Sequence, residues 1–305
     1  MSADGSSRAV FAALFANLGI AASKFAAAAV TGSGSMLAEA VHSLADTGNQ
    51  VLLLVGGRKA QNAPTPAHPF GFGRERYFWS FAVAIVLFTL GGAFAMLEGV
   101  EKLRHPHAVA ATGWALGVLA LAIALEALSL RTAVRESNRV RGNATWLQFI
   151  RRAKVPELPV VLLEDVGALV GLVLALAAVL LTRLTGDTTF DALGTLSIGV
   201  LLCAIALVLA REMKSLLIGE AAAPEVEERI AQALRDSPSV RHVIYIRTQH
   251  LGPEELLVAA KLEFDGALSM PGLAAAIDAA EAAVRAQVPA ARYLFVEPDV
   301  KRAAG

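Results

Sequence analysis

Cysteine is nearly absent from this chain, since Cys203 is the only one among 305 residues and lies in an apolar run. A single thiol excludes a disulfide framework, and it also excludes a zinc site built from several thiolates. Charge is scarce as well, because Asp, Glu, Lys and Arg together make up 18% of the residues while hydrophobic residues make up 55%. Soluble domains rarely have this composition, and long apolar stretches indicate a polytopic membrane protein.

The N-terminal sequence lacks a signal-peptide cleavage pattern. No A-x-A sequence of the kind cut by signal peptidase follows the first apolar run, so we expect the run from Val10 onward to be retained as a first membrane span.

Six runs are apolar and long enough to cross a bilayer, which takes about 20 helical residues for about 30 Å of hydrocarbon. They cover residues 8–30, 36–57, 77–100, 109–131, 158–182 and 190–211. Basic residues gather in the connectors after the second and fourth runs, namely Arg58, Lys59, Arg74, Arg76, Arg131, Arg135, Arg139, Arg141, Arg151, Arg152 and Lys154. By the positive-inside rule both connectors are cytoplasmic, and an even number of spans then places both termini in the cytoplasm.

The chain takes on a soluble composition from about residue 214. Amphipathic and alternating patterns predict the order α-β-β-α-β over residues 224–236, 240–248, 256–264, 272–287 and 292–296. We therefore expect an α-helical polytopic membrane protein. It has a six-helix transmembrane domain over 1–213 and a small two-layer α+β domain over 214–305.

Four polar residues interrupt the second span. Glu39, His42, Asp46 and Asn49 are spaced i, i+3, i+7 and i+10, so a helix projects all four from one face. A carboxylate or imidazole facing lipid is costly, so this face turns toward protein or a water-filled cavity. His42 and Asp46, one turn apart, can direct a ring nitrogen and a carboxylate at one zinc-type ion. Polar groups that hydrogen-bond to neighbouring helices would give the same pattern, so both interpretations stay open.

Further acids lie in the later spans. Glu126 is in the fourth span, and Glu164 and Asp165 are adjacent in the fifth. Two neighbouring acids inside an apolar helix do not fit a lipid-facing surface. They are metal ligands, or they are protonated or paired with Lys24 of the first span. Glu126 fits a proton route or a hydrogen bond to a neighbouring helix equally well.

Together these motifs resemble the cation diffusion facilitator family. The resemblance is carried by HSLAD in the second span, HPFGFGRER after it, the buried acid of the fifth span and the α-β-β-α-β tail. HSLADTGNQ and LLEDVGALVG are most similar to the zinc transporter 9-like branch. The resemblance covers essentially the whole chain. It implies a proton-coupled exporter of divalent metals, not an enzyme, that forms a homodimer in the lipid bilayer with cytoplasmic tails and has no nucleic-acid partner.

The resemblance also implies a metal site. The family's second-span ligand pair corresponds to His42 and Asp46, and the second member of its fifth-span pair corresponds to Asp165. The first member of that pair corresponds to Val161, which cannot bind a metal. The fourth ligand then comes from Glu164, which is nearest along the chain, or from Asn49, Glu39 or water.

The family's secondary metal sites are poorly represented. The loop site keeps His68 but has Phe72 where another histidine is expected. The tail positions that bind metal in the family are Ile244, Lys261 and Phe295 or Val296 here. We therefore expect the tail to serve dimerisation and not metal sensing.

The expected mechanism is alternating access around a site near mid-membrane. His42 favours zinc over magnesium or calcium, while manganese, iron, cobalt and cadmium also accept imidazole and carboxylate ligands. Metal binding needs a neutral imidazole and ionised carboxylates, so metal ions and protons compete for the same atoms and can be exchanged. Glu126 and Glu39 are the candidates for the proton route.

The sequence also permits two functions other than metal export. A membrane-embedded metalloenzyme would use a metal on His42 and Asp46 to activate water, but the chain lacks an H-E-x-x-H motif. A scaffold that binds metal without transporting it is permitted by Val161 at a ligand position.

Overall fold

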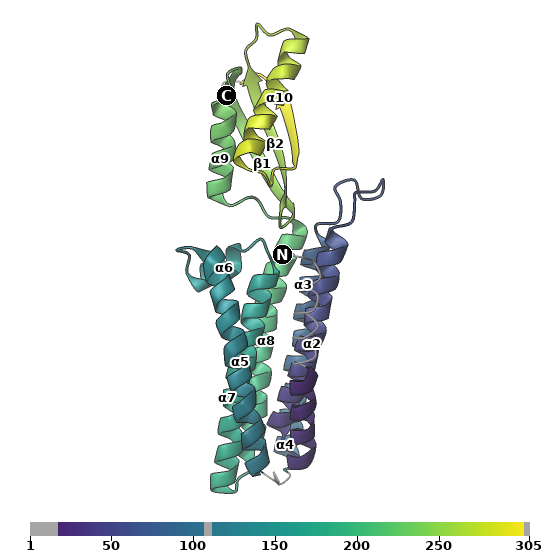
Figure 1. The fold of residues 1–305 in the computed structure, drawn as a ribbon, viewed down its shortest axis with the longest axis vertical. Helices are drawn as coiled ribbons and strands as arrows, with labels where there is room; N and C mark the ends of the chain where they lie inside the picture. Colours follow the sequence, from purple (N-terminus) through teal and green to yellow (C-terminus); the bar gives the residue numbers. More distant parts are fainter. Residues whose placement is uncertain (1–17, 107–111, 302–305) are drawn as a thin grey trace. The chain divides into compact units, whose positions relative to one another are not determined.

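The computed structural model describes residues 18–106 and 112–301 (Figure 1). The chain divides into two compact units, here called the helical unit (Met1–Gly56 and Phe78–Met213) and the tail unit (Gly57–Tyr77 and Lys214–Gly305). Each unit has a hydrophobic core of its own. The connector between the second and third predicted spans therefore belongs to the tail unit.

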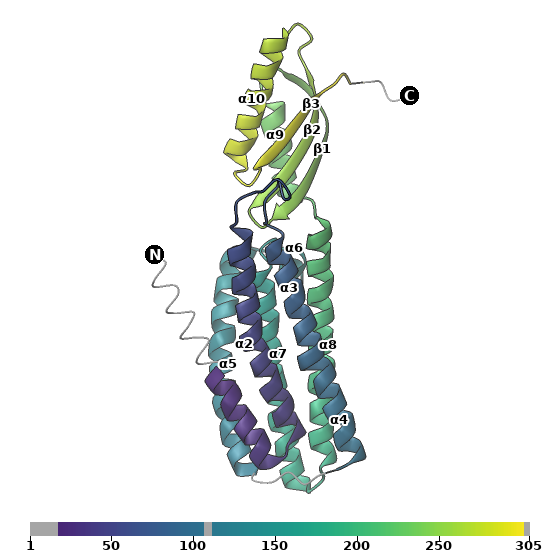
Figure 2. The same ribbon diagram turned by 90° about the vertical axis from the view of Figure 1, so that its right-hand side faces the viewer.

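The helical unit is a bundle of long helices. A helix described over Leu18–Thr31 precedes α2 (Gly34–Ala60), α3 (Glu75–Val86), the π-helical segment η1 (Leu87–Ala93), α4 (Phe94–Arg104), α5 (Thr112–Arg141), α6 (Trp146–Arg152), α7 (Glu157–Thr185) and α8 (Thr189–Ile218). Helix α5 packs along α7, and both figures of the ribbon show α2 running beside α3 (Figures 1 and 2). The bundle places the polar face of α2 opposite α5 and α7.

Four helical stretches in the described ranges are long and apolar enough to cross a membrane. They are Glu75–Arg104, Leu116–Arg141, Glu157–Thr185 and Thr189–Ile218, and they overlap the third to sixth predicted spans. Helix α2 has 27 residues, but its polar stripe lowers its hydropathy. Residues 8–17 of the first predicted span and 109–111 of the fourth lie outside the described ranges. The first and second spans stay a prediction.

Small residues bring α8 close to η1 and α4. A Cβ atom at Gly92 would overlap Cys203, and one at Gly99 would lie 2.6 Å from Leu196 Cγ. Membrane helices associate mainly through van der Waals packing, which close backbone approach improves. The glycines therefore allow the tight seam along which α8 packs.

Asp191 fastens the start of α2 to the start of α8. Its buried carboxylate accepts hydrogen bonds from Ser33 Oγ (2.5 Å), Ser35 Oγ (2.6 Å) and the backbone N–H of Gly34 (2.8 Å). The first N–H groups of a helix have no partner within it, so they need an outside acceptor. Asp191 supplies that acceptor from a helix more than 150 residues away in the chain.

The tail unit has the predicted α-β-β-α-β order. Its elements are α9 (Pro224–Arg235), β1 (Val240–Gly252), β2 (Glu255–Phe264), α10 (Met270–Gln287) and β3 (Tyr293–Pro298). The sheet order is β1-β2-β3, with β1 antiparallel and β3 parallel to β2. Every second residue of β2 is buried, and these residues form the core with α9 and α10, which lie on one side of the sheet (Figure 2). This is a two-layer α+β domain.

The connector between α2 and α3 packs against the β1–β2 hairpin within the tail unit. The Phe70 ring meets the Tyr293 ring edge-on, with centroids 5.2 Å apart. Gly73 lies so close to the hairpin that a Cβ atom there would be 2.8 Å from the carbonyl oxygen of Leu251. The His68 ring contacts the Phe72 ring in a tilted arrangement, with centroids 4.7 Å apart and planes at 57°. The connector is therefore an ordered part of the tail unit.

Candidate metal transport site

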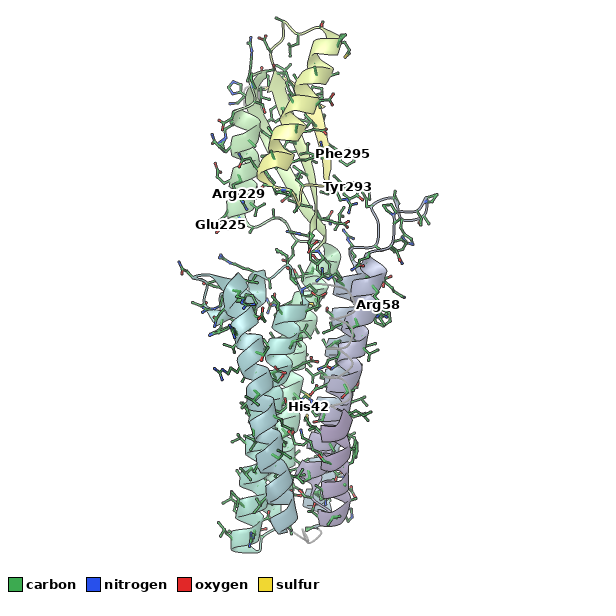
Figure 3. All side chains as sticks on the ribbon, in the orientation of Figure 1. His42, Arg58, Glu225, Arg229, Tyr293 and Phe295 are labelled. Atoms are coloured by element: carbon green, nitrogen blue, oxygen red, sulfur yellow. The ribbon has the colours of Figure 1, made fainter. Side chains whose placement is uncertain are left out.

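The polar stripe of α2 lies inside the helical bundle. His42 lies between the two ends of the bundle, well away from either (Figure 3). Glu39, His42 and Asn49 are fully buried. Buried polar groups need partners, so the surrounding helices determine what this stripe can bind.

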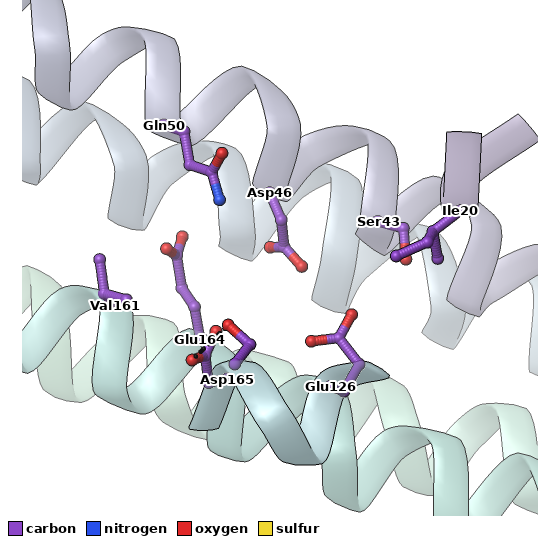
Figure 4. A pocket seen from close by; sticks show the side chains of 9 residues that line it. Ile20, Ser43, Asp46, Gln50, Glu126, Val161, Glu164 and Asp165 are labelled. Atoms are coloured by element: carbon purple, nitrogen blue, oxygen red, sulfur yellow. Dashed lines mark hydrogen bonds between the residues drawn. The ribbon is translucent and has the colours of Figure 1, made fainter. Parts of the chain in front are cut away.

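A small cavity separates α2 from α5 and α7. Its volume is about 40 Å³, enough for an ion or one or two water molecules. The lining includes four carboxylic acids: Asp46 from α2, Glu126 from α5, and Glu164 and Asp165 from α7. Figure 4 shows Asp46 on one wall facing the other three across the cavity. Several carboxylates in a low-dielectric cavity repel one another, so a cation or protons must balance them.

Two of these acids are held by neighbouring side chains. Asn49 donates a hydrogen bond from Nδ2 to Glu164 Oε1 at 2.6 Å, and Ser129 Oγ donates one to Asp165 Oδ2 at 3.0 Å. Asn49 does not line the cavity. It therefore orients a carboxylate that does.

His42 lies beside the cavity and is not part of its lining. Its Nε2 atom is 3.5 Å from Asp46 Oδ2, and a Cβ atom at Gly91 of η1 would be 3.7 Å from its Nδ1 atom. Within residues 18–106 and 112–301 neither ring nitrogen has a hydrogen-bond partner, although the side chain is fully buried. An unpartnered buried imidazole next to a carboxylate is suited to accept a metal ion or a proton.

Glu39 belongs to a separate buried ion pair. Lys24 Nζ lies 3.3 Å from Glu39 Oε2 and donates a hydrogen bond to Ser43 Oγ at 2.6 Å. All three side chains are buried. The interpretation that pairs Lys24 with the fifth-span acids is therefore wrong, because its carboxylate partner is on α2.

The predicted site residues thus fall into two groups. The structure brings Asp46, Glu126, Glu164 and Asp165 to one cavity, with Val161 in its wall, and leaves His42, Asn49 and Glu39 just outside the lining. Over residues 18–106 and 112–301, no group of three or more His, Cys, Asp and Glu side chains is arranged to hold a metal. The acids surround the cavity without converging on one point.

Three polar lining residues were not among the sequence-based candidates. They are Ser43, Gln50 and Ser129, and the apolar Ile20 also lines the cavity. Helical spacing carries a signal for all three polar residues, since Ser43 precedes Asp46 by three residues, Gln50 follows Asp46 by four and Ser129 follows Glu126 by three. Neutral polar residues are common in membrane helices, so this signal is weak without the structure.

Comparison with known proteins decides the family. The model of the cation efflux transmembrane domain matches residues 10–218. The chain belongs to the cation efflux family, the cation diffusion facilitators. Members of this family are multi-pass membrane transporters and not enzymes. The metalloenzyme alternative is therefore wrong.

Several members of the cation efflux family are similar to the chain. The human protein named proton-coupled zinc antiporter SLC30A9, mitochondrial, is 35% identical over 80% of the chain and 43% of its own length. Metal tolerance protein C4 of Arabidopsis thaliana is 30% identical over 86% of the chain and 58% of its own length. Cation-efflux pump FieF of Pectobacterium atrosepticum is 27% identical over 88% of the chain and 85% of its own length. The chain spans less than half the length of the zinc antiporters it matches.

Solved structures resemble the tail. A nickel form of the MamM C-terminal domain is 22% identical and covers 26% of the chain and all of that domain, with a TM-score of 0.25.

Proposed function

We propose that this cation efflux protein is a proton-coupled exporter of divalent metal ions that works by alternating access, with Zn²⁺ as its preferred cargo. The observation that carries this proposal is the cavity inside the helical unit that is lined by Asp46, Glu126, Glu164 and Asp165. The similarity to proteins named proton-coupled zinc antiporters supports both the ion and the coupling.

In this proposal the metal is held by Asp46, Asp165, Glu164 and His42. The carboxylates compensate the large cost of removing a dication from water. Glu164 takes the ligand role that Val161 cannot fill, because it reaches the cavity from the same helix. His42 joins by turning its ring toward Asp46, whose carboxylate is already 3.5 Å away. Mn²⁺, Fe²⁺, Co²⁺ and Cd²⁺ suit the same donors and are secondary cargo.

Proton coupling follows from the chemistry of these ligands. A metal ion binds ionised carboxylates and a neutral imidazole. Protons that bind to the same oxygen and nitrogen atoms displace the metal ion. Glu126 lines the cavity without a hydrogen bond to Asn49 or Ser129, so it is the residue proposed to pass protons to the site. Export of one ion is then linked to entry of protons by the same cavity.

The proposed membrane arrangement has six spans, both termini in the cytoplasm, and a homodimer formed through the tail. The sheet face opposite α9 and α10 exposes Phe295 and Tyr245, which are 55% and 42% accessible. Exposed aromatic side chains of this kind favour burial against a second copy. The transport domain over 1–213 and the dimerisation domain over 214–305 are part of this proposal.

The test uses the purified protein in sealed lipid vesicles. An imposed pH gradient should drive Zn²⁺ across the membrane, and inverting the gradient should invert the direction of flux. Calorimetry on the same preparation measures Zn²⁺ binding. Binding without gradient-driven flux would mean a transport-inactive scaffold, and absence of both would exclude a metal function.

A further inference from the structure

Lys24 is a fully buried cation beside the acid-lined cavity. Its ammonium contacts Glu39 Oε2 and Ser43 Oγ, and Ser43 itself lines the cavity. Ile20, one helical turn before Lys24, is also part of the lining. A single hydrogen bond therefore separates the ammonium from the wall of the cavity. A positive charge at that place acts on any cation that enters.

Glu39 is held between this ammonium and α7. A Cβ atom at Gly171 of α7 would overlap Glu39 Oε1, so the carboxylate occupies space that only glycine leaves open. In the part of the chain that the structure describes, Glu39 Oε1 has no hydrogen-bond partner, and Glu39 is fully buried. The charge of Lys24 is thus the main compensation for this carboxylate.

We propose that Lys24 is a built-in counter-cation of the transport site, which neutralises Glu39 and keeps it out of the metal's coordination sphere. This inference rests on the proposed function, because it concerns the affinity of the same cavity for its cargo. Glu39 then belongs neither to the ligand set nor to the proton route. Its role is to compensate the positive charge of Lys24, which would otherwise repel the metal ion.

The reason for such a pair is electrostatic. The cavity already has four acids for a dication, and a fifth uncompensated carboxylate would bind the ion more tightly and slow its release. An uncompensated ammonium would do the opposite and repel the ion. A neutral Lys24–Glu39 pair avoids both effects while filling the space between the first helix, α2 and α7.

Two variants of the full chain test this inference. Glu39→Gln keeps the shape of the side chain and leaves the Lys24 charge uncompensated, so Zn²⁺ affinity should fall by about tenfold or more. Lys24→Met together with Glu39→Gln replaces a neutral pair by another neutral pair of similar size. This double variant should bind Zn²⁺ within about twofold of the parent protein and transport it under a pH gradient.

The measurements are Zn²⁺ titration by calorimetry and vesicle flux, with thermal unfolding to show that each variant is folded. Glu39→Gln binding Zn²⁺ as the parent does would overturn the inference, since the ammonium would then not act on the cavity. A double variant that loses Zn²⁺ binding or proton coupling would also overturn it, by making Glu39 a ligand or proton carrier. If Glu39→Gln alone does not fold, the double variant still tests the inference, because loss of its Zn²⁺ binding or proton coupling would overturn it.

A failure of the proposed function looks different. In that case the parent protein itself shows neither Zn²⁺ binding nor gradient-driven flux, whatever residues stand at positions 24 and 39. The comparison of variants is meaningful only when the parent binds Zn²⁺.

Discussion

The side-chain amide of Asn49 lies 2.6 Å from Oε1 of Glu164, and this hydrogen bond joins the two helices that face each other across the acid-lined cavity. Both side chains are buried, and Asn49 lies outside the cavity while Glu164 lines it. A carboxylate held through one oxygen by an amide keeps its orientation when an ion arrives or leaves. In the proposed metal site Asn49 is therefore a positioning residue for Glu164.

Asn49→Ala should weaken Zn²⁺ binding by about tenfold, because loss of an outer partner commonly reduces metal affinity by this factor or more. It should also lower the free energy of unfolding by about 1–3 kcal/mol, since a buried acceptor loses its donor. Calorimetry and thermal unfolding in detergent measure the two effects. The control is Asn62→Ala in the exposed connector, which should change neither quantity. Unchanged affinity in Asn49→Ala would contradict the positioning role.

Asp46→Asn and Asp165→Asn should each reduce Zn²⁺ affinity about a hundredfold or more, because removing one charged partner of a buried ion pair costs about 3–5 kcal/mol. Vesicle flux and calorimetry check this outcome in protein that still inserts into the membrane. Asp187→Asn is the matched control, since Asp187 is exposed in the turn between α7 and α8. Parent-like flux in either cavity variant would show that the cavity is not the transport site.

The third to sixth spans and the order of elements in the tail could be predicted because both depend on local sequence. Long apolar runs indicate α7 and α8 whichever helices they pack against. The alternation of apolar and polar residues in β2 follows from the burial of one face of the strand. The helical spacing of Asp46 relative to His42 also holds in any helix. These features need no knowledge of distant contacts.

The pairing of side chains could not be predicted in the same way. Lys24 pairs with Glu39 and not with Glu164. This pairing depends on the rotation of the first helix relative to α2, and no local sequence pattern determines that rotation. The ring of His42 lies beside the cavity and not in its lining, which helical spacing alone does not determine. The docking of Gly73 on the β1–β2 hairpin joins segments that are about 180 residues apart in the sequence. Such contacts depend on the whole fold.

Gly171→Ala should destabilise the helical unit by about 1–3 kcal/mol, because the added methyl group overlaps Glu39 and the buried pair must shift. Gly117→Ala in α5 is the control, since nothing lies within 4 Å of a Cβ atom there. Thermal unfolding of both variants measures the difference. Equal stability would mean that Glu39 moves aside without cost.

Asp191→Ala should lower the free energy of unfolding by about 2–4 kcal/mol, because Ser33, Ser35 and the N–H of Gly34 lose a charged acceptor together. The control is Asp278→Ala on the exposed face of α10. Asp191 is far from the cavity lining, so Zn²⁺ affinity of the folded variant should stay within about twofold of the parent. A large loss of affinity would place Asp191 in the transport machinery instead.

The turn after β2 should be sensitive to acid. The backbone N–H of Ala267 and the nearby Arg241 guanidinium hold the pKa of Asp265 below its ordinary value. Its contribution to stability is therefore complete above the unfolded-state pKa of about 4 and is lost as pH falls through the lower folded-state value.

Hydrogen exchange of the peptide containing Ala267, corrected for the intrinsic rate at each pH, measures this effect. Protection should fall below about pH 4 in the parent. It should become independent of pH in Asp265→Asn, whose side chain keeps the acceptor oxygen but has no charge to lose. Identical pH profiles in the two proteins would contradict the role of the Asp265 charge.

Val161 gives one wall of the cavity a surface of methyl groups, which cannot bind a metal ion. In the proposed site the ligand on that side must then come from Glu164 and not from the residue one turn before Asp165. A wall that offers no ligand removes one bond that the ion would have to break on leaving. The valine thus suits a carrier, which must release its cargo in every transport cycle.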